Sequence, residues 1–383
     1  MESRLRVLVV SDISVNPAES YSQVHVCQIL RQLLAAGQDV SYAYLQGQSF
    51  AHSAAVTDMA QAQGLQLLGL QSVATLTAAH YEVLYLTHLW RPKYLQQGIS
   101  LAQTWRYRGA ARPAIVYDSH DCLYKGVAPL LPTSAGAALI AAEMQMRALA
   151  DVSVLISDRE RSDAITHFGL DPARVRVLSP VADLWPAGFL RPHRQRQDLC
   201  FVGFPHRSNV QALHYFLQAV FPRILQQRPR MRLKIMGSNT QLLRLDFPDT
   251  ITRQISVLGH VSDLAEAMSH CRMLVAPILE GAGVKGKILE SLACGTPVVC
   301  TSKAVEGMPV SDGNELLTAD DPDAFCAKVL QLDEDEALWT SLQQRGRSLI
   351  ESRYSAVRLS DELRDLLTAI NQFNAAFKQD VPS

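Results

Sequence analysis

The sequence predicts an α/β protein made of two domains, each with a doubly wound parallel sheet, that face each other across a cleft. Three observations predict this class: the length, the apolar content, and a regular alternation of strand-like and helix-like segments. The chain has 383 residues, which is more than one hydrophobic core usually holds. It is 48% hydrophobic and 19% charged, so apolar side chains are available for buried sheets and a disordered chain is excluded.

Short apolar runs alternate with helix-length segments through the first half. Residues 4–10 form a continuous apolar run, the pattern of a strand that is buried on both faces. Residues 23–36 have helical periodicity and end at Gly37, a suitable C-cap, before a second run at 39–45. The same rhythm continues at residues 83–87, 114–117, 135–150 (helical) and 152–156. We therefore expect a parallel sheet with its ligand site at the carboxyl ends of the strands.

A segment without periodicity, residues 180–198, separates the two halves and is rich in Pro, Arg and Gln, as in an interdomain linker. Apolar runs resume after it, at residues 199–202, 233–236, 255–258, 273–276 and 298–300. Residues 335–378 are helical in period without a strand, and either pack on the second domain or cross back to the first. We predict an N-terminal domain at 1–184, a C-terminal domain at 185–360 and a helical tail at 361–383.

Charge and cysteine content exclude further classes of protein. The formal net charge is −1, from 36 basic and 37 acidic residues, which lacks the global charge of a nucleic-acid-binding protein. The 7 cysteines are an odd number without CxxC spacing, so we expect reduced core residues and no zinc cluster. No stretch approaches the roughly 18 apolar residues of a membrane span, and the first residues lack the pattern of a secretory signal. We expect a cytoplasmic protein.

The segment most informative about chemistry is residues 276–308, where a strand ends in a glycine-rich loop that leads into a helix near Lys285. Amide groups at such a junction favour a phosphate, and Lys285 and Lys287 add positive charge. The loop contains three glycines that let the backbone approach a ligand closely: Gly281, Gly283 and Gly286.

Glu290 lies three residues after Lys287, about one helical turn, so its carboxylate can face the loop and accept hydrogen bonds from a ribose diol. These groups together fit the diphosphate and ribose of a nucleotide. The alternative is a tight strand-to-helix turn whose lysines and glutamate are solvated, because isolated glycine-rich turns are common.

The string KILESLACGTPVV, residues 287–299, resembles the donor-binding signature of the retaining glycosyltransferases of family 4 and their GT-B relatives. The resemblance also covers FVGFPHRSNVQALHYF, KIMGSN and VLGHVSDLAEAMSHCRMLVAPI, at residues 201–216, 234–239 and 257–278. It implies the GT-B fold with two Rossmann-like domains, a nucleotide-sugar donor held mainly by the second half, and recognition of the ribose by Glu290. The family usually has another glutamate eight positions earlier, where this chain has Ala282. Glu280 can replace that glutamate only if the loop is reshaped.

Further donor contacts are expected in the string FVGFPHRSN. Gly203 follows a strand, and Arg207 lies on the next loop, where its guanidinium can pair with a donor phosphate unless it is an ordinary surface arginine. We expect Asn209 to cap the following helix rather than touch ligand. The predicted donor-binding residues are Gly203, Arg207, Gly281, Gly283, Val284, Lys285, Lys287 and Glu290.

The candidate catalytic residues are His120, Asp121 and Lys285. The string VYDSHD places His120 and Asp121 just after a strand, where the resembled family commonly has a histidine that faces the donor sugar. A neutral imidazole there can hydrogen-bond a sugar hydroxyl or stabilise the developing oxocarbenium region. The alternative is a histidine held by a neighbouring aspartate for structural reasons.

His88 also ends a strand, and together with Glu280 it is a candidate sugar or acceptor contact. The loop after the first strand lacks the glycine pair of many family members, which leaves three polar residues unassigned: Asn16, Ser20 and His25.

The resemblance implies transfer with retention, in which the departing diphosphate can itself take the proton of the acceptor hydroxyl. We expect no metal and no cofactor, because Lys285, Arg207 and helix amides can neutralise the diphosphate. The expected partners are a nucleotide-diphosphate sugar donor and a glycan or lipid-linked acceptor. Two alternatives stay open: a nucleotide-sugar 2-epimerase of related fold, and a non-catalytic sugar-nucleotide-binding partner protein, which Ala282 favours.

Residues 83–117 contain five basic and no acidic residues. The basic residues are Arg91, Lys93, Arg106, Arg108 and Arg112, and they interleave with Trp90, Tyr94, Trp105 and Tyr107. Such a mixture suits the headgroups of an anionic bilayer or a polyanionic acceptor, so we hypothesise peripheral contact with the inner face of the membrane. The alternative is a solvated helix whose aromatic rings pack inward.

Overall fold

The computed structural model describes residues 4–12, 21–45, 54–68, 81–106, 112–120, 123–186, 190–243 and 246–379. The chain divides into two compact units. Unit 1 comprises Met1–Pro180 and Val357–Ser383, and unit 2 comprises Val181–Ala356. The boundaries between units thus fall after residues 180 and 356, where the sequence analysis placed them after 184 and 360.

Unit 1 contains a 7-stranded sheet in the order β3-β2-β1-β4-β5-β6-β7, with every neighbouring pair parallel. The strands are β1 (Arg6–Ser11), β2 (Asp39–Tyr44), β3 (Gln66–Leu68), β4 (Val83–Thr87), β5 (Ala114–Asp118), β6 (Val152–Leu155) and β7 (Val175–Val177). The central strands β4 and β5 are buried along their whole length, which is why they are apolar without alternation. The strand order reverses between β1 and β4, the point where doubly wound sheets bind ligands.

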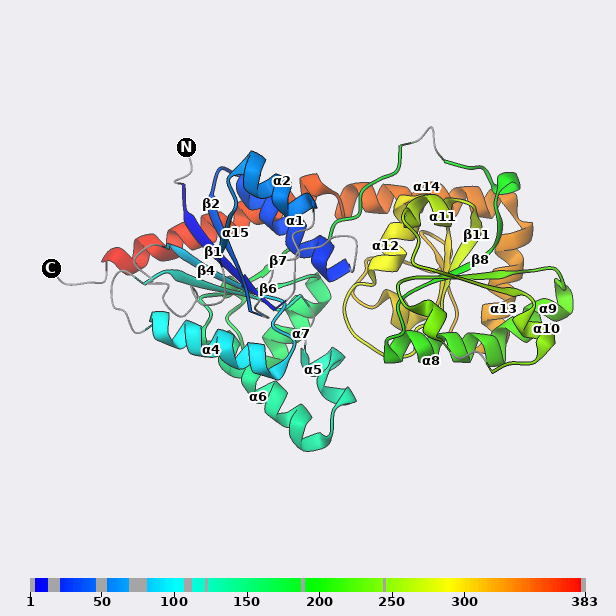
Figure 1. Ribbon diagram of the computed structural model, residues 1–383, viewed down its shortest axis with the longest axis horizontal. Coiled ribbons are helices and arrows are strands. Elements are labelled where there is room, and N and C mark those ends of the chain that lie inside the picture. The colour runs from blue at the N-terminus through cyan, green and yellow to red at the C-terminus, as the bar shows by residue number, and fades with distance from the viewer. Residues whose placement is uncertain are drawn as a thin grey trace. The chain divides into compact units, whose positions relative to one another are not determined.

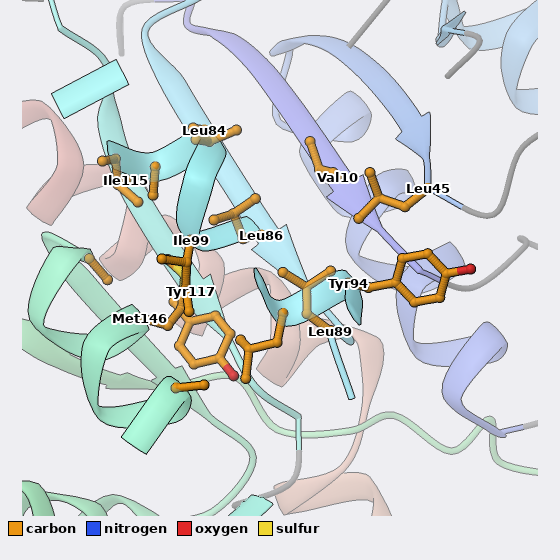
Figure 2. Close-up of a cluster of buried hydrophobic side chains, with 14 of the residues drawn as sticks. Val10, Leu45, Leu84, Leu86, Leu89, Tyr94, Ile99, Ile115, Tyr117 and Met146 are labelled. Carbon is orange, nitrogen blue, oxygen red and sulfur yellow. The ribbon is translucent and has the colours of Figure 1, made fainter. Parts of the chain in front are cut away.

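Helices cover both faces of this sheet (Figure 1). They are α1 (Tyr21–Ala35), α2 (Ala54–Gln63), α4 (Pro92–Arg106), α5 (Leu123–Gly126), α6 (Thr133–Leu149), α7 (Asp158–Phe168) and α15 (Ala356–Gln379). On the face covered by α4 and α6, Leu84, Leu86 and Ile115 of the strands pack with Ile99 of α4 and Met146 of α6 (Figure 2).

The C-terminal helix α15 packs within unit 1. Glu362 of this helix accepts hydrogen bonds from the backbone NH and the hydroxyl of Ser179, at 2.6 and 2.9 Å. The guanidinium of Arg112 lies 5.0 Å from the centre of the Phe373 ring. The sequence left two arrangements open for residues 335–378, and the structure has both: the helix Glu336–Arg353 lies in unit 2, and the chain from Val357 onward belongs to unit 1.

Unit 2 contains a 6-stranded parallel sheet in the order β10-β9-β8-β11-β12-β13. The strands are β8 (Gln197–Val202), β9 (Leu233–Met236), β10 (Ile255–Gly259), β11 (Cys271–Ala276), β12 (Val298–Cys300) and β13 (Leu317–Thr318). The helices are α8 (Arg207–Tyr215), α9 (Phe221–Gln227), α10 (Asp249–Thr252), α11 (Leu264–Ser269), α12 (Gly286–Ala293), α13 (Pro322–Glu334) and α14 (Glu336–Arg353). In Figure 1, α8, α9 and α13 cover one face and α11, α12 and α14 the other. The strand order reverses between β8 and β11.

The predicted class, two parallel and doubly wound α/β sheets, is confirmed. Three strands were not predicted from the sequence, namely β3, β7 and β13. Each has only two or three residues, is partly exposed and lies at a sheet edge, so none has a continuous buried apolar run. The six cysteines for which a state is described are free and buried, as predicted. In the described part of the chain, no helix is long and apolar enough to cross a membrane.

Candidate functional site

Two loops meet at the carboxyl ends of the neighbouring strands β8 and β11 in unit 2. The loop after β8 contains Gly203 and leads into α8, and the loop after β11 leads into α12 at Gly286. A Cβ on Gly203 would lie 2.6 Å from the side-chain nitrogen of Asn209, so the close packing at this point depends on glycine. Two helix N-termini therefore begin at the switch point of this sheet, where their amide groups can bind an anion.

Lys287 joins these two loops. Its Nζ donates to Oδ1 of Asn209 at 2.6 Å and lies 5.1 Å from the centre of the Phe201 ring. The amide nitrogen of Asn209 donates in turn to the carbonyl of Phe204 at 3.0 Å. The expectation that Asn209 caps α8 is wrong, because His206 is the N-cap and Asn209 lies inside the helix. Asn209 is a site residue that the sequence analysis assigned to a structural role.

Burial shifts the pKa of both ionisable residues on α12. It raises the pKa of Glu290 to about 7, against the opposing effect of the Lys287 charge. Burial, together with the nearby charge of Lys285, lowers the pKa of Lys287 to about 7. Both groups therefore titrate near neutral pH, where a bound anion favours the charged ammonium and a donated hydroxyl favours the carboxylate.

Lys285 is the N-cap of α12, and its side chain folds back onto the glycine-rich loop. Its Nζ donates to the carbonyls of Ala282 and Gly283, at 2.5 and 2.8 Å. Gly281 and Gly283 have φ angles of 114° and 79°, which L-residues rarely adopt. Val284 between them and the helix is buried. The ammonium of Lys285 thus stabilises the loop.

Glu280 already has two partners on α8. Nε of Arg207 lies 3.2 Å from Oε1 of Glu280, and the side-chain amide of Gln211 donates to both carboxylate oxygens, at 3.1 and 3.2 Å. The side chain of Arg207 is 64% exposed and that of Glu280 is 24% exposed. The structure therefore pairs two predicted site residues, one from each loop. Whether Glu280 replaces the glutamate that is absent at Ala282 stays a prediction.

Unit 1 has a cluster of three buried histidines at the switch point of its own sheet. His88 follows β4, His120 follows β5, and His25 lies near the start of α1. Their exposed fractions are 0%, 5% and 1%. The ring centre of His120 lies 4.4 Å from that of His88 and 4.5 Å from that of His25. The structure thus brings two predicted residues together and adds His25, which the sequence analysis left unassigned.

The backbone is left-handed at two of these histidines, with φ of 53° at His88 and 57° at His120. This conformation costs an L-residue about 1–2 kcal/mol. Asp118 stabilises it, because its Oδ1 accepts the backbone NH of His120 at 3.1 Å, as in an Asx turn. Its Oδ2 accepts from the hydroxyls of Tyr85 and Thr87, at 2.9 and 3.2 Å. Residues that are held in a strained backbone concentrate at functional sites.

Among the described residues, no aspartate holds the His120 imidazole, which was the structural alternative. Asp118 contacts the backbone of His120, and Nδ1 of the ring has no hydrogen-bond partner in the described structure. Burial lowers the pKa of His120 to about 3, so the ring is neutral near pH 7. Burial raises the pKa of Asp118 to about 6. The other candidate in this loop, Asp121, lies outside the described residues, as do Asn16 and Ser20.

The sequence contains two Asp-x-Asp strings, at residues 321–323 and 333–335, and an aspartate of each has a structural role. Asp321 accepts the backbone NH groups of Asp323 and Ala324 at the start of α13, and Asp335 accepts that of Leu338 in α14. Both are helix caps. Among the described residues, the His25, His88 and His120 cluster is the only group of three or more His, Cys, Asp or Glu side chains close enough to hold a metal ion. The sequence analysis expected no such cluster, because its members are distant in the chain.

The aromatic rings of the basic segment at 83–117 are largely unavailable to a membrane. Trp105 is 1% exposed and Tyr94 is 9% exposed, because both lie on the face of α4 that packs in the core. For these two rings the hypothesis of a headgroup contact is wrong, and the alternative of inward packing is confirmed. Tyr107 lies outside the described residues.

The basic residues of that segment fall into two groups. Arg112 is buried and donates to both carboxylate oxygens of Asp151, at 2.6 and 2.9 Å. Arg91 and Lys93 are exposed, at the start of α4. Arg106 donates to a backbone carbonyl within unit 1, and Arg108 lies outside the described residues. Only part of the predicted charge is therefore free to meet a surface.

Comparisons with known proteins identify unit 2. Residues 196–335 match the family model described as Glycosyl transferases group 1. The match covers 140 of the 383 residues of the chain and lies within unit 2. The chain is 30% identical over 219 residues to the O-antigen chain mannosyltransferase B of Escherichia coli, covering 51% of this chain and 55% of that protein. It is 29% identical over 185 residues to the D-inositol 3-phosphate glycosyltransferase of Mycobacterium tuberculosis (strain F11), covering 44% of this chain and 37% of that protein. These matches span about half or less of the relatives' length.

The fold of the whole chain is that of solved glycosyltransferase structures. Anabaena HepE in complex with UDP has a TM-score of 0.70 at 16% identity, covering 95% of this chain and 100% of that one. The sucrose-phosphate synthase of Thermosynechococcus elongatus has a TM-score of 0.66 at 16% identity, covering 97% and 100%. At such identities the likeness shows the fold alone. The predicted GT-B fold and the resemblance to the glycosyltransferase family are confirmed.

Proposed function

We propose that this GT-B protein is a glycosyltransferase that moves a sugar from a nucleotide-diphosphate donor to a hydroxyl of a glycan or lipid-linked acceptor. One observation carries the proposal: Lys287 bonds Asn209 where two helices begin, and its charge acts on the buried Glu290, all within the residues that match the group 1 glycosyltransferase model. The arrangement places Lys287 and Glu290 where burial shifts both pKa values to about 7, which disfavours their charged forms. A strand-to-helix turn alone would not need two such buried ionisable groups.

In this proposal the donor is held by its diphosphate and its ribose. The amide groups that open α12 and α8 face the diphosphate, and the ammonium of Lys287 lies between the two loops. The carboxylate of Glu290, one turn along α12, accepts hydrogen bonds from the ribose hydroxyls. Arg207 and Lys285 can add charge to the phosphates once they leave Glu280 and the loop carbonyls.

The proposed chemistry needs negative charge on the leaving diphosphate to be stabilised, and fixed protein groups supply that stabilisation. Cations and helix amides in a preorganised site act most strongly on charge that develops in the transition state. We propose that no divalent ion is needed at the diphosphate, so that transfer persists in EDTA. We also propose retention, with the acceptor proton passing to the diphosphate oxygen, on the basis of the family resemblance.

Unit 1 is proposed to contact the transferred sugar and the acceptor. His88 and His120 follow the neighbouring strands β4 and β5. Their imidazoles are neutral near pH 7, because burial lowers their pKa values. Neutral imidazole can donate to or accept from a sugar hydroxyl. We propose that the exposed Arg91 and Lys93 add a weak attraction to an anionic membrane surface or glycan at this unit.

The first donors to test are UDP-sugars, because a solved protein of this fold contains UDP-glucose. We expect release of UDP in the presence of an acceptor mixture, and a loss of more than tenfold in Glu290→Gln and in Lys285→Ala, which corresponds to at least ~1.4 kcal/mol of donor or transition-state binding. Glu351→Gln, on the exposed side of α14, is the matched control. Rates near those of the unaltered chain in both site variants would refute the proposed site.

A second candidate function is a sugar-nucleotide binder without catalysis. Ala282 replaces the family glutamate, and Glu280 is engaged by Arg207. Donor binding in calorimetry, with neither transfer nor slow hydrolysis of any donor in the panel, would favour this function over the enzyme. Conversion of the donor sugar in the absence of an acceptor would instead favour the nucleotide-sugar epimerase.

A further inference from the structure

The histidine cluster of unit 1 leaves buried polar atoms that no group in the described part of the chain satisfies. Both ring nitrogens of His25, both of His88, and Nδ1 of His120 have no hydrogen-bond partner. An unsatisfied buried donor or acceptor costs about 1–3 kcal/mol, so native proteins rarely bury several of them together. Each of the three rings therefore has at least one buried nitrogen that is available to a shared ligand.

We propose that His25, His88 and His120 form a binding site for one divalent transition-metal ion, with Zn²⁺ as the representative. One nitrogen from each ring lies within 4.8 Å of the other two. Three imidazoles without a thiolate suit Zn²⁺, Cu²⁺ or Ni²⁺, whereas Mg²⁺ and Ca²⁺ prefer oxygen ligands. The proposed site has three protein ligands and one open position, which is the pattern of zinc sites that keep a water or an exogenous ligand.

The required movement is small. Zn–N bonds of about 2.0–2.1 Å in a tetrahedral site place the nitrogens roughly 3.4 Å apart. The present upper separation of 4.8 Å therefore has to contract by little more than an ångström, which rotation of the imidazoles about their side-chain bonds can provide. The backbone already directs these side chains together, because His88 and His120 hold left-handed φ angles at the ends of neighbouring strands.

Asp118 supplies the outer partner that such a site needs. Its Oδ2 lies 3.9 Å from Nε2 of His25, and both residues are fully buried. A carboxylate that accepts the second ring N–H fixes the tautomer and the orientation of a metal-bound histidine. A ring rotation that brings Nε2 of His25 within hydrogen-bond distance of Asp118 leaves Nδ1 as the ligand atom. The hydroxyls of Tyr85 and Thr87 already hold the carboxylate in place.

Occupancy of this site has a consequence that rests on the proposed function. A metal ion takes the lone pairs of His88 and His120, which are then unavailable to hydroxyls of the sugar. Zn²⁺ should therefore inhibit transfer, and EDTA should restore it. This role differs from that of the ions that neutralise diphosphates in other transferases, because the cluster lies in unit 1 and the proposed diphosphate site lies in unit 2.

The test is titration of the metal-stripped full chain with Zn²⁺ by calorimetry, and with Co²⁺ by visible absorption, in the absence of donor and acceptor. We expect one ion per chain and the intense Co²⁺ band of a four-coordinate site. His25→Gln and His120→Gln should each weaken binding by more than the roughly 10–100-fold that loss of an outer partner causes. His270→Gln is the matched control, because His270 is an exposed histidine 2.9 Å from Glu266 and is an alternative surface site.

Thermal melting of each metal-free variant establishes that it is folded, and Zn²⁺ should raise the melting temperature of the unaltered chain and of His270→Gln only. Absence of stoichiometric binding, or binding that His270→Gln abolishes and both cluster variants retain, would overturn the proposal. The result is independent of the proposed function. Normal transfer without zinc binding refutes the metal site alone, and zinc binding without transfer refutes the enzymatic function alone.

Discussion

Binding of a UDP-sugar should take up a proton above neutral pH and release one below it. The cause is the pair of shifted groups on α12. The pKa of Lys287 is lowered to about 7 and that of Glu290 is raised to about 7, in both cases mainly by burial. A bound diphosphate favours the ammonium form of Lys287, and a bound ribose favours the carboxylate form of Glu290. The ligand therefore drives protonation of one group and deprotonation of the other.

The magnitudes follow from the two pKa values. At pH 8 about nine tenths of the Lys287 side chains are neutral in the free protein and about one tenth of the Glu290 side chains are protonated, so the net uptake should be about 0.8 proton. The need to protonate Lys287 weakens binding by about tenfold for one pH unit above its pKa, which is ~1.4 kcal/mol. At pH 6 the two fractions are exchanged, so the net release should be about 0.8 proton. Donor affinity should be highest near pH 7.

The assay is calorimetric titration with UDP-glucose in pairs of buffers that differ in ionisation enthalpy, at pH 6 and pH 8. Lys287→Met should abolish the uptake at pH 8 and keep the release at pH 6, and Glu290→Gln should do the reverse. Lys328→Met is the control, because Lys328 is on α13 and pairs with Asp312. No proton exchange at either pH, or exchange that both site variants retain, would refute the assignment of these groups to the donor site.

Three further outcomes are expected. Gly203→Ala places a Cβ 2.6 Å from the side-chain nitrogen of Asn209, which should displace Asn209 from Lys287. Donor binding should then weaken roughly tenfold, with little change in the free energy of unfolding. Unchanged donor affinity in calorimetry would contradict this. Arg112→Ala leaves the carboxylate of Asp151 buried without its bidentate partner. It should lower the free energy of unfolding, measured by urea titration, by about 3 kcal/mol. A loss below ~1 kcal/mol would contradict this. Anionic liposomes should co-sediment the chain only weakly and only at low salt, since two exposed basic residues add about 1 kcal/mol each; binding that resists high salt would require another contact.

Much of the fold could be predicted because the strands are buried on both faces. Val83–Thr87, Leu233–Met236 and Val298–Cys300 have the predicted bounds, since a continuous apolar run bounded by polar residues marks such a strand. The edge strands β3, β7 and β13 escaped prediction because they are short and partly exposed, so none has the continuous buried apolar run that marks the three-residue strand β12. Strand order was also beyond the sequence, because pairing depends on contacts between distant segments.

The site divides in the same way. Lys287 and Glu290 were predicted together, because one helical turn separates them and the spacing itself places them on one face. The bond from Lys287 to Asn209 crosses 78 residues of sequence, and Asn209 instead had the local pattern of a helix cap. The histidine cluster was missed as a unit for the same reason. His88 and His120 each follow a strand, but only the sheet order shows that these strands are neighbours and that α1 brings His25 to them.

The two sheets also differ in how they form unusual backbone at their switch points, and this difference can be tested. Unit 2 has glycine at such positions, as at Gly281 and Gly283. In the proposed function the backbone of this loop faces the donor. Unit 1 has a histidine, His120, at a φ of 57°. This conformation costs about 1–2 kcal/mol, which indicates that the imidazole side chain is needed at this position. His120→Gly should relieve the strain, which offsets part of the packing lost with the buried imidazole, while transfer falls. Transfer at the rate of the unaltered chain, measured on variant protein that urea titration shows to be folded, would refute a functional role for this imidazole.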